Sequence, residues 1–410
     1  MVSGILMGQQ VYSPPTTGLH APPTLSTFAP TQPLAGSGPG QGGTPGGPTT
    51  PSAPACTTTT PFTVSPMPVS QIPAIIPQGN INPSAHVMPT NHAYLGLPGL
   101  VPGQWPLFAP GDMTLTNVVV KTNTENVNGV ESAPYEELAL GFQVCGGINL
   151  LFDHVNSPSA KIQAALNAQM PYPSLECSTG VNGTVTSTAC NVTVSVPVSA
   201  GEQIAVSSGI TPTIDFGAWN TQGAAVPFLE PRRYLDESNY NVCPVSLFTT
   251  SLQAQLGTLL GTLQGTQFVP RTAAPVCGVI NFDVAGTVSG NWWPTQLPAG
   301  AQSVASDESG GAAFMADNIN PAIPVISLGN DIPGIPTGRY VPAAGTPAFT
   351  SIQYSVTPQM VCFANLGGAS SPNQILLVSM IATDQLRIEG QTGTCSPTPA
   401  FTSQALTVYR

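Results

Sequence analysis

The chain has 410 residues, of which only 7% are charged, and its formal net charge is −11. Ordinary soluble domains carry about 25% charged residues, so this composition is unlike that of an average cytosolic enzyme. Lys121 and Lys161 are the only lysines and no basic cluster exists, which argues against nucleic acid as a partner and disfavours anionic membranes. No stretch approaches the roughly 18 consecutive apolar residues of a membrane-spanning helix, so the sequence predicts no transmembrane segment.

Residues 1–111 form an uncharged arm rich in Pro, Gly and Thr, and Asp112 is the first charged residue. Residues 14–70 have too few apolar side chains to offset the cost of ordering, so we expect them to be disordered or polyproline-like. In residues 71–110, Ile, Leu and Trp stand among prolines. Such a segment can lie extended along its own chain or along a neighbour. The first 15 residues lack a basic start and a long apolar core, and they make a poor signal peptide.

Residues 112–235 are predicted to form the first β-rich domain. Apolar residues alternate with polar ones from residue 113 to residue 123, and two stretches that begin near residues 141 and 191 are rich in Val, Ile, Phe and Thr. These residue types predict strands of one antiparallel sheet. A short helix is expected after Ser157 and Pro158, and Gly201 is expected in a turn, because glycine accepts a positive φ angle.

This domain contains F-D-H-V at residues 152–155, then a helical pattern, then V-S-A-G-E-Q-I at residues 198–204. In this order the segments resemble the β-barrel core, or duplicated hybrid motif, of lysostaphin-type zinc peptidases, which cleave bacterial cell walls, and of their inactive relatives. The resemblance places His154 where the family has its intermediate, catalytic-type His. The early ligand segment has no His here, and Thr213 and Asp215 stand where the family has His-x-His. The resemblance therefore implies a degenerate domain without metal ligands and without a cofactor.

Residues 236–269 are predicted to form a connector with one helix, at about residues 245–264. The leucines at positions 252, 256, 259, 260 and 263 fall on one face at helical spacing. Gly257 and Gly261 weaken this helix by about 1 kcal/mol each relative to Ala. We expect the leucine face to seal one domain against the next.

Residues 270–410 are predicted to form a second β-rich domain. It begins with C-x-x-I-x-F-D-V-x-G-x-x-x-G-N-W and is similar to the region after the degenerate peptidase-like domain in some uncharacterised bacterial secreted proteins. Trp292 and Trp293 could offer a stacking platform for sugars. Adjacent residues on a strand point to opposite faces, so we expect at least one of the two in the core. The predicted fold is thus mainly β: two barrel- or sandwich-like domains, one connecting helix and the arm.

Eight cysteines without any C-x-x-C pair favour disulfides over zinc or redox chemistry, and hence a secreted or cell-surface protein. We expect the bridges Cys177–Cys190 and Cys362–Cys395, and Cys243–Cys277 if the intervening helix folds back. Cys56 and Cys145 have no obvious partner, although one long-range bridge could pin the arm to the barrel. Asn182 and Asn191 each begin an N-x-T sequon and are candidate glycan acceptors in a host that glycosylates.

Candidate catalytic residues are few. His20, His86 and His92 fall in the arm, which leaves His154 as the only histidine of the predicted domains. Asp153, His154 and Asp215 could cluster, but a zinc site needs three or four converging ligands, so we predict no metal site. No G-x-S-x-G elbow or phosphate-binding loop is present.

These observations favour a noncatalytic extracellular protein with a structural or binding role, built on an inactive peptidase-like barrel. Its partners would be further copies of the chain, assembled through the arm, or a cell-surface polymer. The alternative is a cell-wall or polysaccharide hydrolase whose active site the sequence does not reveal.

Overall fold

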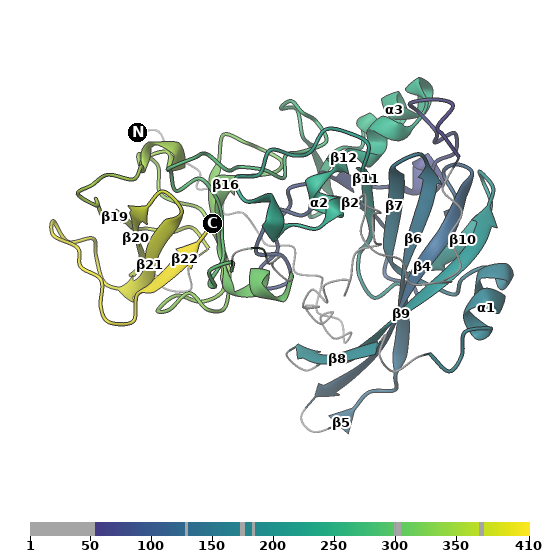
Figure 1. Ribbon diagram of the computed structural model, residues 1–410, viewed down its shortest axis with the longest axis horizontal. Helices are drawn as coiled ribbons and strands as arrows, with labels where there is room; N and C mark the ends of the chain where they lie inside the picture. Colours follow the sequence, from purple (N-terminus) through teal and green to yellow (C-terminus); the bar gives the residue numbers. More distant parts are fainter. Residues whose placement is uncertain are drawn as a thin grey trace.

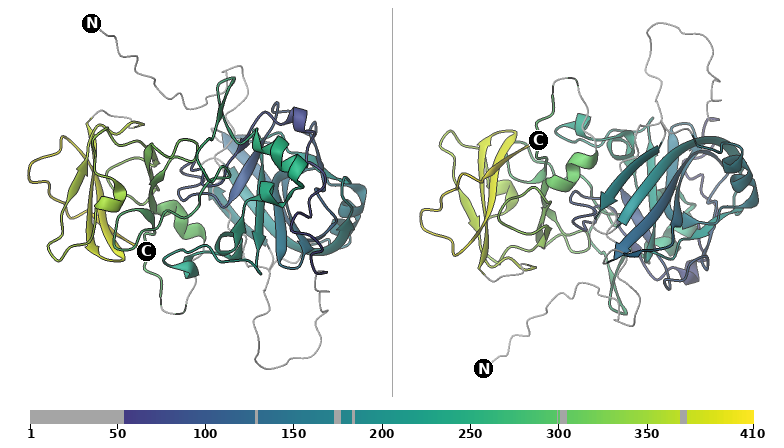
Figure 2. Two further views of the ribbon diagram at one scale, coloured as in Figure 1. Left: turned by 90° about the horizontal axis from the view of Figure 1, so that it is seen from above. Right: turned by 90° about the horizontal axis from the view of Figure 1, so that it is seen from below.

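The computed structural model describes residues 54–127, 130–172, 177–182, 185–298, 300, 305–368 and 373–410, and it is mainly β, as predicted (Figure 1). One large antiparallel sheet forms a first body, and two four-stranded antiparallel sheets form a second. The two bodies lie side by side along the long axis of the molecule (Figure 2). No helix in the described part of the chain is long and apolar enough to cross a membrane.

The sheet of the first body has the strand order β1-β2-β11-β7-β6-β4-β9-β8, and β3, β5, β10 and β12 pair beside this path. The strands are β1 (Ile75–Ile76), β2 (His92–Gly96), β3 (Pro106–Phe108), β4 (Met113–Val127), β5 (Val130–Glu131), β6 (Tyr135–Cys145), β7 (Ile148–Asn156), β8 (Cys177–Asn182), β9 (Val185–Val198), β10 (Gln203–Ser207), β11 (Thr213–Asn220) and β12 (Asn241–Val242). Helix α1 (Ala160–Asn167) follows β7 and buries Ile162 and Leu166. In β9 every second residue, from Val192 to Val198, is buried, as expected of a sheet with one face in the core.

Residues 54–111 belong to the first body and are not a separate arm. Phe62, Met67, Ile75 and Leu95 are completely buried in the same core as the strands β4 to β11. β2 pairs with β11 over five residues and β1 pairs with β2, so the former arm supplies the two strands at one end of the sheet. The expected domain start at residue 112 is therefore wrong, and the expectation of disorder to residue 70 is wrong for residues 54–70. Residues 1–53 lie outside the described part of the chain.

The connecting helix is shorter than predicted. A 3₁₀ turn (Pro244–Leu247) precedes α3 (Thr250–Gly257), and the chain then forms a hairpin of β13 (Gly261–Gln264) and β14 (Gln267–Pro270). Gly261 lies so close to β14 that a Cβ there would come within 2.3 Å of the Val269 carbonyl oxygen. Leu256 and Leu260 are buried in the core of the first body, so the leucine face does not seal one body against the other. Before the 3₁₀ turn at Pro244–Leu247, the chain forms another 3₁₀ turn (Pro231–Arg233) and the short helix α2 (Asp236–Asn239).

The second body is a sandwich of two sheets. The first consists of β15 (Gly290–Trp292), β16 (Ala312–Ala316), β17 (Pro324–Leu328) and β18 (Gly338–Tyr340), and the second of β19 (Val361–Phe363), β20 (Gln374–Ala382), β21 (Gln385–Thr392) and β22 (Leu406–Tyr409). Short 3₁₀ turns occur at Ala305–Gly310 and Phe349–Ser351. Phe314 and Phe363 come from different sheets and pack in one core, with their ring centroids 6.5 Å apart.

The outer face of the β15–β18 sheet contacts the first body. Ala313, Met315 and Val325 alternate with the sandwich-facing residues of the same strands and pack against Ile81 and Met88. Ile81 and Met88 precede β2 in the chain. One segment, residues 77–97, therefore covers the second body and then enters the sheet of the first.

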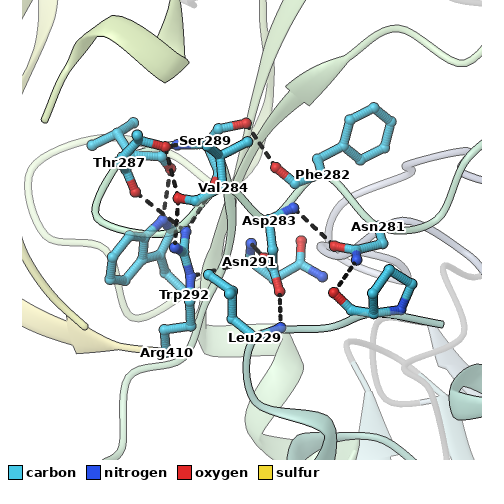
Figure 3. A network of polar contacts seen from close by, with 12 residues as sticks. Leu229, Asn281, Phe282, Asp283, Val284, Thr287, Ser289, Asn291, Trp292 and Arg410 are labelled. Atoms are coloured by element: carbon cyan, nitrogen blue, oxygen red, sulfur yellow. Dashed lines mark hydrogen bonds and ion pairs between the residues drawn. The ribbon is translucent and has the colours of Figure 1, made fainter. Parts of the chain in front are cut away.

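A network of polar contacts surrounds Asp283 and Arg410 in the second body (Figure 3). Arg410 lies over the Trp292 ring, 4.2 Å from its centroid, and its guanidinium donates to the backbone carbonyl oxygens of Ser289, Thr287 and Val284 at 2.5, 3.4 and 3.2 Å. Its Nε lies 3.8 Å from the Asp283 carboxylate. That carboxylate also accepts hydrogen bonds from two backbone N–H groups, those of Asn291 and Leu229, the latter in the segment between β11 and α2.

All eight cysteines are paired. The three expected bridges, Cys177–Cys190, Cys243–Cys277 and Cys362–Cys395, are confirmed, and the remaining two cysteines form Cys56–Cys145, with a sequence separation of 89. Cys177 and Cys190 lie directly opposite each other in the ladder of β8 and β9. Cys56–Cys145 attaches the start of the described chain to the end of β6. Four disulfides fit a protein of an extracellular, oxidising compartment.

The junction between the bodies predicts a pH-dependent stability. The half-buried Glu308 accepts a hydrogen bond from the Met88 N–H (3.0 Å), and burial raises the pKa of Glu308 to about 7. A raised carboxyl pKa means that the folded state binds the proton more tightly. Stability is therefore lost as pH rises from about 4.5 through 7, by at most about 3 kcal/mol before allowance for solvent screening. Glu308→Gln keeps an acceptor for Met88 and should raise the free energy of unfolding at pH 8 but not at pH 4.

Urea unfolding of the wild type, Glu308→Gln and the exposed control Glu131→Gln at both pH values checks this prediction. Equal effects of Glu308→Gln at pH 4 and pH 8 would contradict it.

Candidate functional site

A cluster of six charged or ionisable side chains crosses the sheet of the first body. Its members are His92 on β2, Asp215 on β11, Asp153 and His154 on β7, Glu137 on β6 and Lys121 on β4. These five strands are consecutive in the sheet, so the topology brings residues that are distant in sequence together. We call this set the polar cluster.

A bulge in β7 lets two adjacent residues join the polar cluster. Leu138 and Leu140 of β6 pair with Val155 and Phe152 of β7, so one residue of β6 lies opposite two of β7, Asp153 and His154. His154 has a φ of 63°, which is uncommon for a residue other than glycine. Bulges of this kind redirect side chains and are frequent beside functional sites. In a regular strand, Asp153 and His154 would point to opposite faces.

His154 is held between carboxylates. Its Nδ1 lies 3.2 Å from Glu137 Oε1, and its Nε2 lies 3.8 Å from Asp215 Oδ2. The side chain of Glu137 is fully buried. Lys121 is opposite Glu137 in the ladder of β4 and β6, but its Nζ reaches across to Asp153 Oδ2, at 2.5 Å.

His92 approaches Asp215 from the other side. His92 Nε2 lies 3.4 Å from Asp215 Oδ2, while His92 Nδ1 is 2.9 Å from Asn91 Oδ1. The rings of His86 and Tyr94 pack edge-on against the His92 ring, with centroid distances of 5.4 and 4.8 Å. Two of the histidines that the sequence places in the arm therefore lie at the cluster.

Burial and charge shift the pKa values of the histidines in opposite directions. Burial alone would lower the pKa of His154, but the carboxylates of Asp153, Asp215 and Glu137 outweigh it and raise that pKa to about 9. Burial lowers the pKa of His92 to about 4 and that of His86 to about 3.

The pKa values of the two aspartates are also shifted in opposite directions. Burial by itself raises the pKa of Asp153, but Lys121 and His154 outweigh it and lower that pKa to about 2. Burial raises the pKa of Asp215, although the positive charge of His154 opposes the change. Paired acids with separated pKa values are typical of functional sites, but they also occur in structural ion-pair networks.

The sequence-based candidates Asp153, His154 and Asp215 thus come together, and their ligand atoms all lie within 4.8 Å of one another. The expectation that His154 stands alone is wrong, because residues 54–111 fold into the sheet and bring His92 and His86. The missed signal is N-H-A-Y-L-G at residues 91–96, a short apolar strand pattern with a histidine at its start. Asn91 and Glu137 have no comparable signal in the sequence.

The two tryptophans are not an exposed stacking platform. Trp292 is fully buried in the sandwich core under Arg410, and Trp293 is 3% exposed on the other face of the sheet, against Tyr234. The prediction that the two point to opposite faces is confirmed. Because both rings are buried, the stacking role predicted from the sequence is wrong for this structure.

The two sequon asparagines lie on adjacent strands. Asn182 is the last residue of β8, and its side chain falls outside the described part of the structure. Asn191 lies within β9, opposite Val119 of β4, and its Oδ1 is buried without a hydrogen-bond partner. A strand interior with a half-buried side chain is a poor position for a glycan.

Comparison with known proteins adds no relative: no family model, no curated protein and no solved structure matches this chain. The resemblance to lysostaphin-type peptidases stays a prediction. The function has to be argued from the residues themselves.

Proposed function

We propose that this chain is a noncatalytic extracellular or cell-surface protein with a structural or binding role. The observation that carries the proposal is the burial of the polar cluster. The side chains of His92 and Asp215 are each 10% exposed and that of His154 is 15% exposed, and they contact one another within the sheet. A wall polymer needs an open groove to reach a reacting atom, whereas this cluster joins five strands. The four disulfides support the extracellular setting.

Self-association is the binding mode that we favour, and it would use residues 1–53. This segment contains no Asp, Glu, Lys or Arg, so it carries no charge to repel a second copy. An extended segment can add to an open sheet edge, and β8 is the last strand on one side of the first sheet. If the segment links copies, removal of residues 1–53 should reduce the number of chains per particle, as measured by solution mass. An unchanged number of chains per particle at high concentration would contradict this mode.

A hydrolase remains the second candidate, because two imidazoles and a carboxylate converge in the polar cluster. His154→Ala separates the two functions. In a structural cluster this change leaves the fully buried Glu137 without its histidine partner, so we expect a loss of about 2–4 kcal/mol in the free energy of unfolding. Neither wild type nor variant should release soluble fragments from peptidoglycan or polysaccharide.

Urea unfolding and a fragment-release assay measure the two outcomes, and His20→Ala serves as the histidine control. Turnover by the wild type that His154→Ala abolishes would favour the hydrolase and overturn the noncatalytic proposal.

A further inference from the structure

We propose that His92, His154 and Asp215 form a binding site for one divalent transition-metal ion, with zinc as the best fit. The three residues come from the neighbouring strands β2, β7 and β11, and Asp215 lies between the two histidines. The proposal goes beyond the noncatalytic role above and does not depend on it.

The distances suit a tetrahedral ion. Zinc binds histidine nitrogen and carboxylate oxygen at about 2.0–2.2 Å, which places the ligand atoms of a tetrahedral site about 3.3–3.6 Å apart. Asp215 Oδ2 lies 3.4 Å from His92 Nε2 and 3.8 Å from His154 Nε2. Both histidine nitrogens thus approach the same carboxylate oxygen, and an ion bound beside Asp215 Oδ2 would have one of them on either side. A fourth position would be left for water or for Asp153, which has a carboxylate oxygen within 4.8 Å of the ligand atoms of His154 and Asp215.

The other ring nitrogen of each histidine is already occupied. His92 Nδ1 is next to Asn91 Oδ1 (2.9 Å), and His154 Nδ1 is next to Glu137 Oε1 (3.2 Å). An oxygen acceptor at Nδ1 keeps a proton on that nitrogen, so Nε2 is the nitrogen that offers its lone pair to a metal, in His154 once the metal displaces the second proton of the ring. Metal-binding histidines are almost always oriented by such an acceptor, which is often a carboxylate. Both histidines therefore present the nitrogen that a metal would take, and both present it to Asp215.

Two of the atoms concerned are buried without a hydrogen bond. Among the described residues, neither His92 Nε2 nor Asp215 Oδ1 has a hydrogen-bond partner, and both residues are more than nine-tenths buried. Buried polar atoms are nearly always paired, so each such exception needs an explanation. A metal ion at this point would coordinate His92 Nε2 and could take Asp215 Oδ1 as well.

The charges of the cluster also call for a cation. Asp153 and Asp215 are direct cross-strand partners in the ladder of β7 and β11, an arrangement that is destabilising for two like charges. Three carboxylates (Glu137, Asp153 and Asp215) face one lysine, Lys121, and a proton on His154 offsets part of the remaining negative charge. A divalent ion bound at Nε2 would replace that proton and cancel the two negative charges that Lys121 leaves unbalanced.

The ligand types decide the class of metal. Calcium and magnesium take oxygen ligands almost exclusively, so two imidazoles disfavour both. Two nitrogens and a carboxylate oxygen suit zinc and the neighbouring first-row ions. A metal held by β2, β7 and β11 would also clamp residues 54–111 onto the sheet, because His92 belongs to that segment.

The test uses the full-length protein. Elemental analysis of the purified protein should find one zinc or related ion per chain. After dialysis against EDTA, titration with Co²⁺ should restore a saturable visible absorption typical of a tetrahedral nitrogen–oxygen site, and Zn²⁺ should displace it. Asp215→Asn removes a ligand charge but preserves shape, and it should weaken Co²⁺ binding by about 100-fold or more, whereas the exposed control Asp384→Asn should bind as the wild type does.

Two results would overturn the site: a chelated wild type that retains its fold by circular dichroism yet binds neither Co²⁺ nor Zn²⁺, or an Asp215→Asn variant with unchanged affinity. Because the wild-type titration needs no substitution, a variant that fails to fold does not rescue the proposal. The result is also separate from that for the proposed function. A metal without polymer turnover leaves the noncatalytic role in place, and turnover without a metal refutes both.

Discussion

We expect a chain that lacks residues 1–110 to fail to fold, whereas a chain that lacks residues 1–53 keeps its structure. The longer truncation removes Phe62, Met67, Ile75 and Leu95, all completely buried, together with strands β1, β2 and β3. Burial of each such side chain contributes about 1.5–3 kcal/mol, and whole domains are stable by only about 5–15 kcal/mol. The loss would thus approach or exceed the entire stability of the first body. It would also leave Cys145 without its partner.

Circular dichroism and limited proteolysis of both truncated proteins measure this difference. The chain without residues 1–53 is the matched control, because the described core begins at Phe62. A chain without residues 1–110 that unfolds cooperatively at the wild-type temperature would show that residues 54–110 are only an accessory layer.

This segment also explains where sequence-based reasoning succeeded and where it did not. The strand patterns of β4, β7, β9 and β11 are visible in the sequence because one face of each is buried, which produces alternation or continuous apolar runs. Residues 54–111 show such a pattern only in the short run at residues 91–96. Their apolar side chains are separated by prolines, and they are buried by partners far away in the chain, such as Phe248 against Phe62, with ring centroids 5.2 Å apart. Composition alone cannot identify such partners.

The prediction for the connector was wrong for a different reason. The leucine spacing from residue 252 to residue 263 fits one helical face, but Gly257 and Gly261 interrupt it, and a hairpin with β14 satisfies the backbone instead. Leu256 and Leu260 are still buried, so the pattern predicted burial correctly and secondary structure incorrectly. Local periodicity does not determine the secondary structure where glycine weakens the helix and a nearby segment can pair as a strand.

The polar cluster could be predicted only in part. Asp153, His154 and Asp215 are visible as polar residues within apolar strands, which singles them out. The bulge that turns His154 towards Asp215 and the arrival of His92 depend on the pairing of β7 with β6 and of β2 with β11. Register of this kind is set by contacts across the whole sheet, so no single stretch of sequence contains it.

The second large effect that we expect is at Arg410. Its side chain is 3% exposed and that of Asp283 is 2% exposed, so Arg410→Ala would leave a buried carboxylate without its cation. Removal of one partner from a buried ion pair costs about 3–5 kcal/mol, because the remaining charge has been taken out of water. The same change frees the carbonyl oxygens of Ser289, Thr287 and Val284 and uncovers the Trp292 ring.

Arg410→Lys tests whether charge alone is enough. A lysine keeps the positive charge but cannot donate from a planar fork to several carbonyl oxygens while it stacks on Trp292, so we expect a smaller but clear loss of stability. The control is Arg232→Ala, which removes an arginine from the exposed pair with Glu230 and should leave the denaturation midpoint unchanged. Urea denaturation followed by tryptophan fluorescence reports on this site directly, because Trp292 lies under Arg410. If Arg410→Ala and Arg232→Ala unfold at the same urea concentration, the network around Asp283 does not hold the second body together.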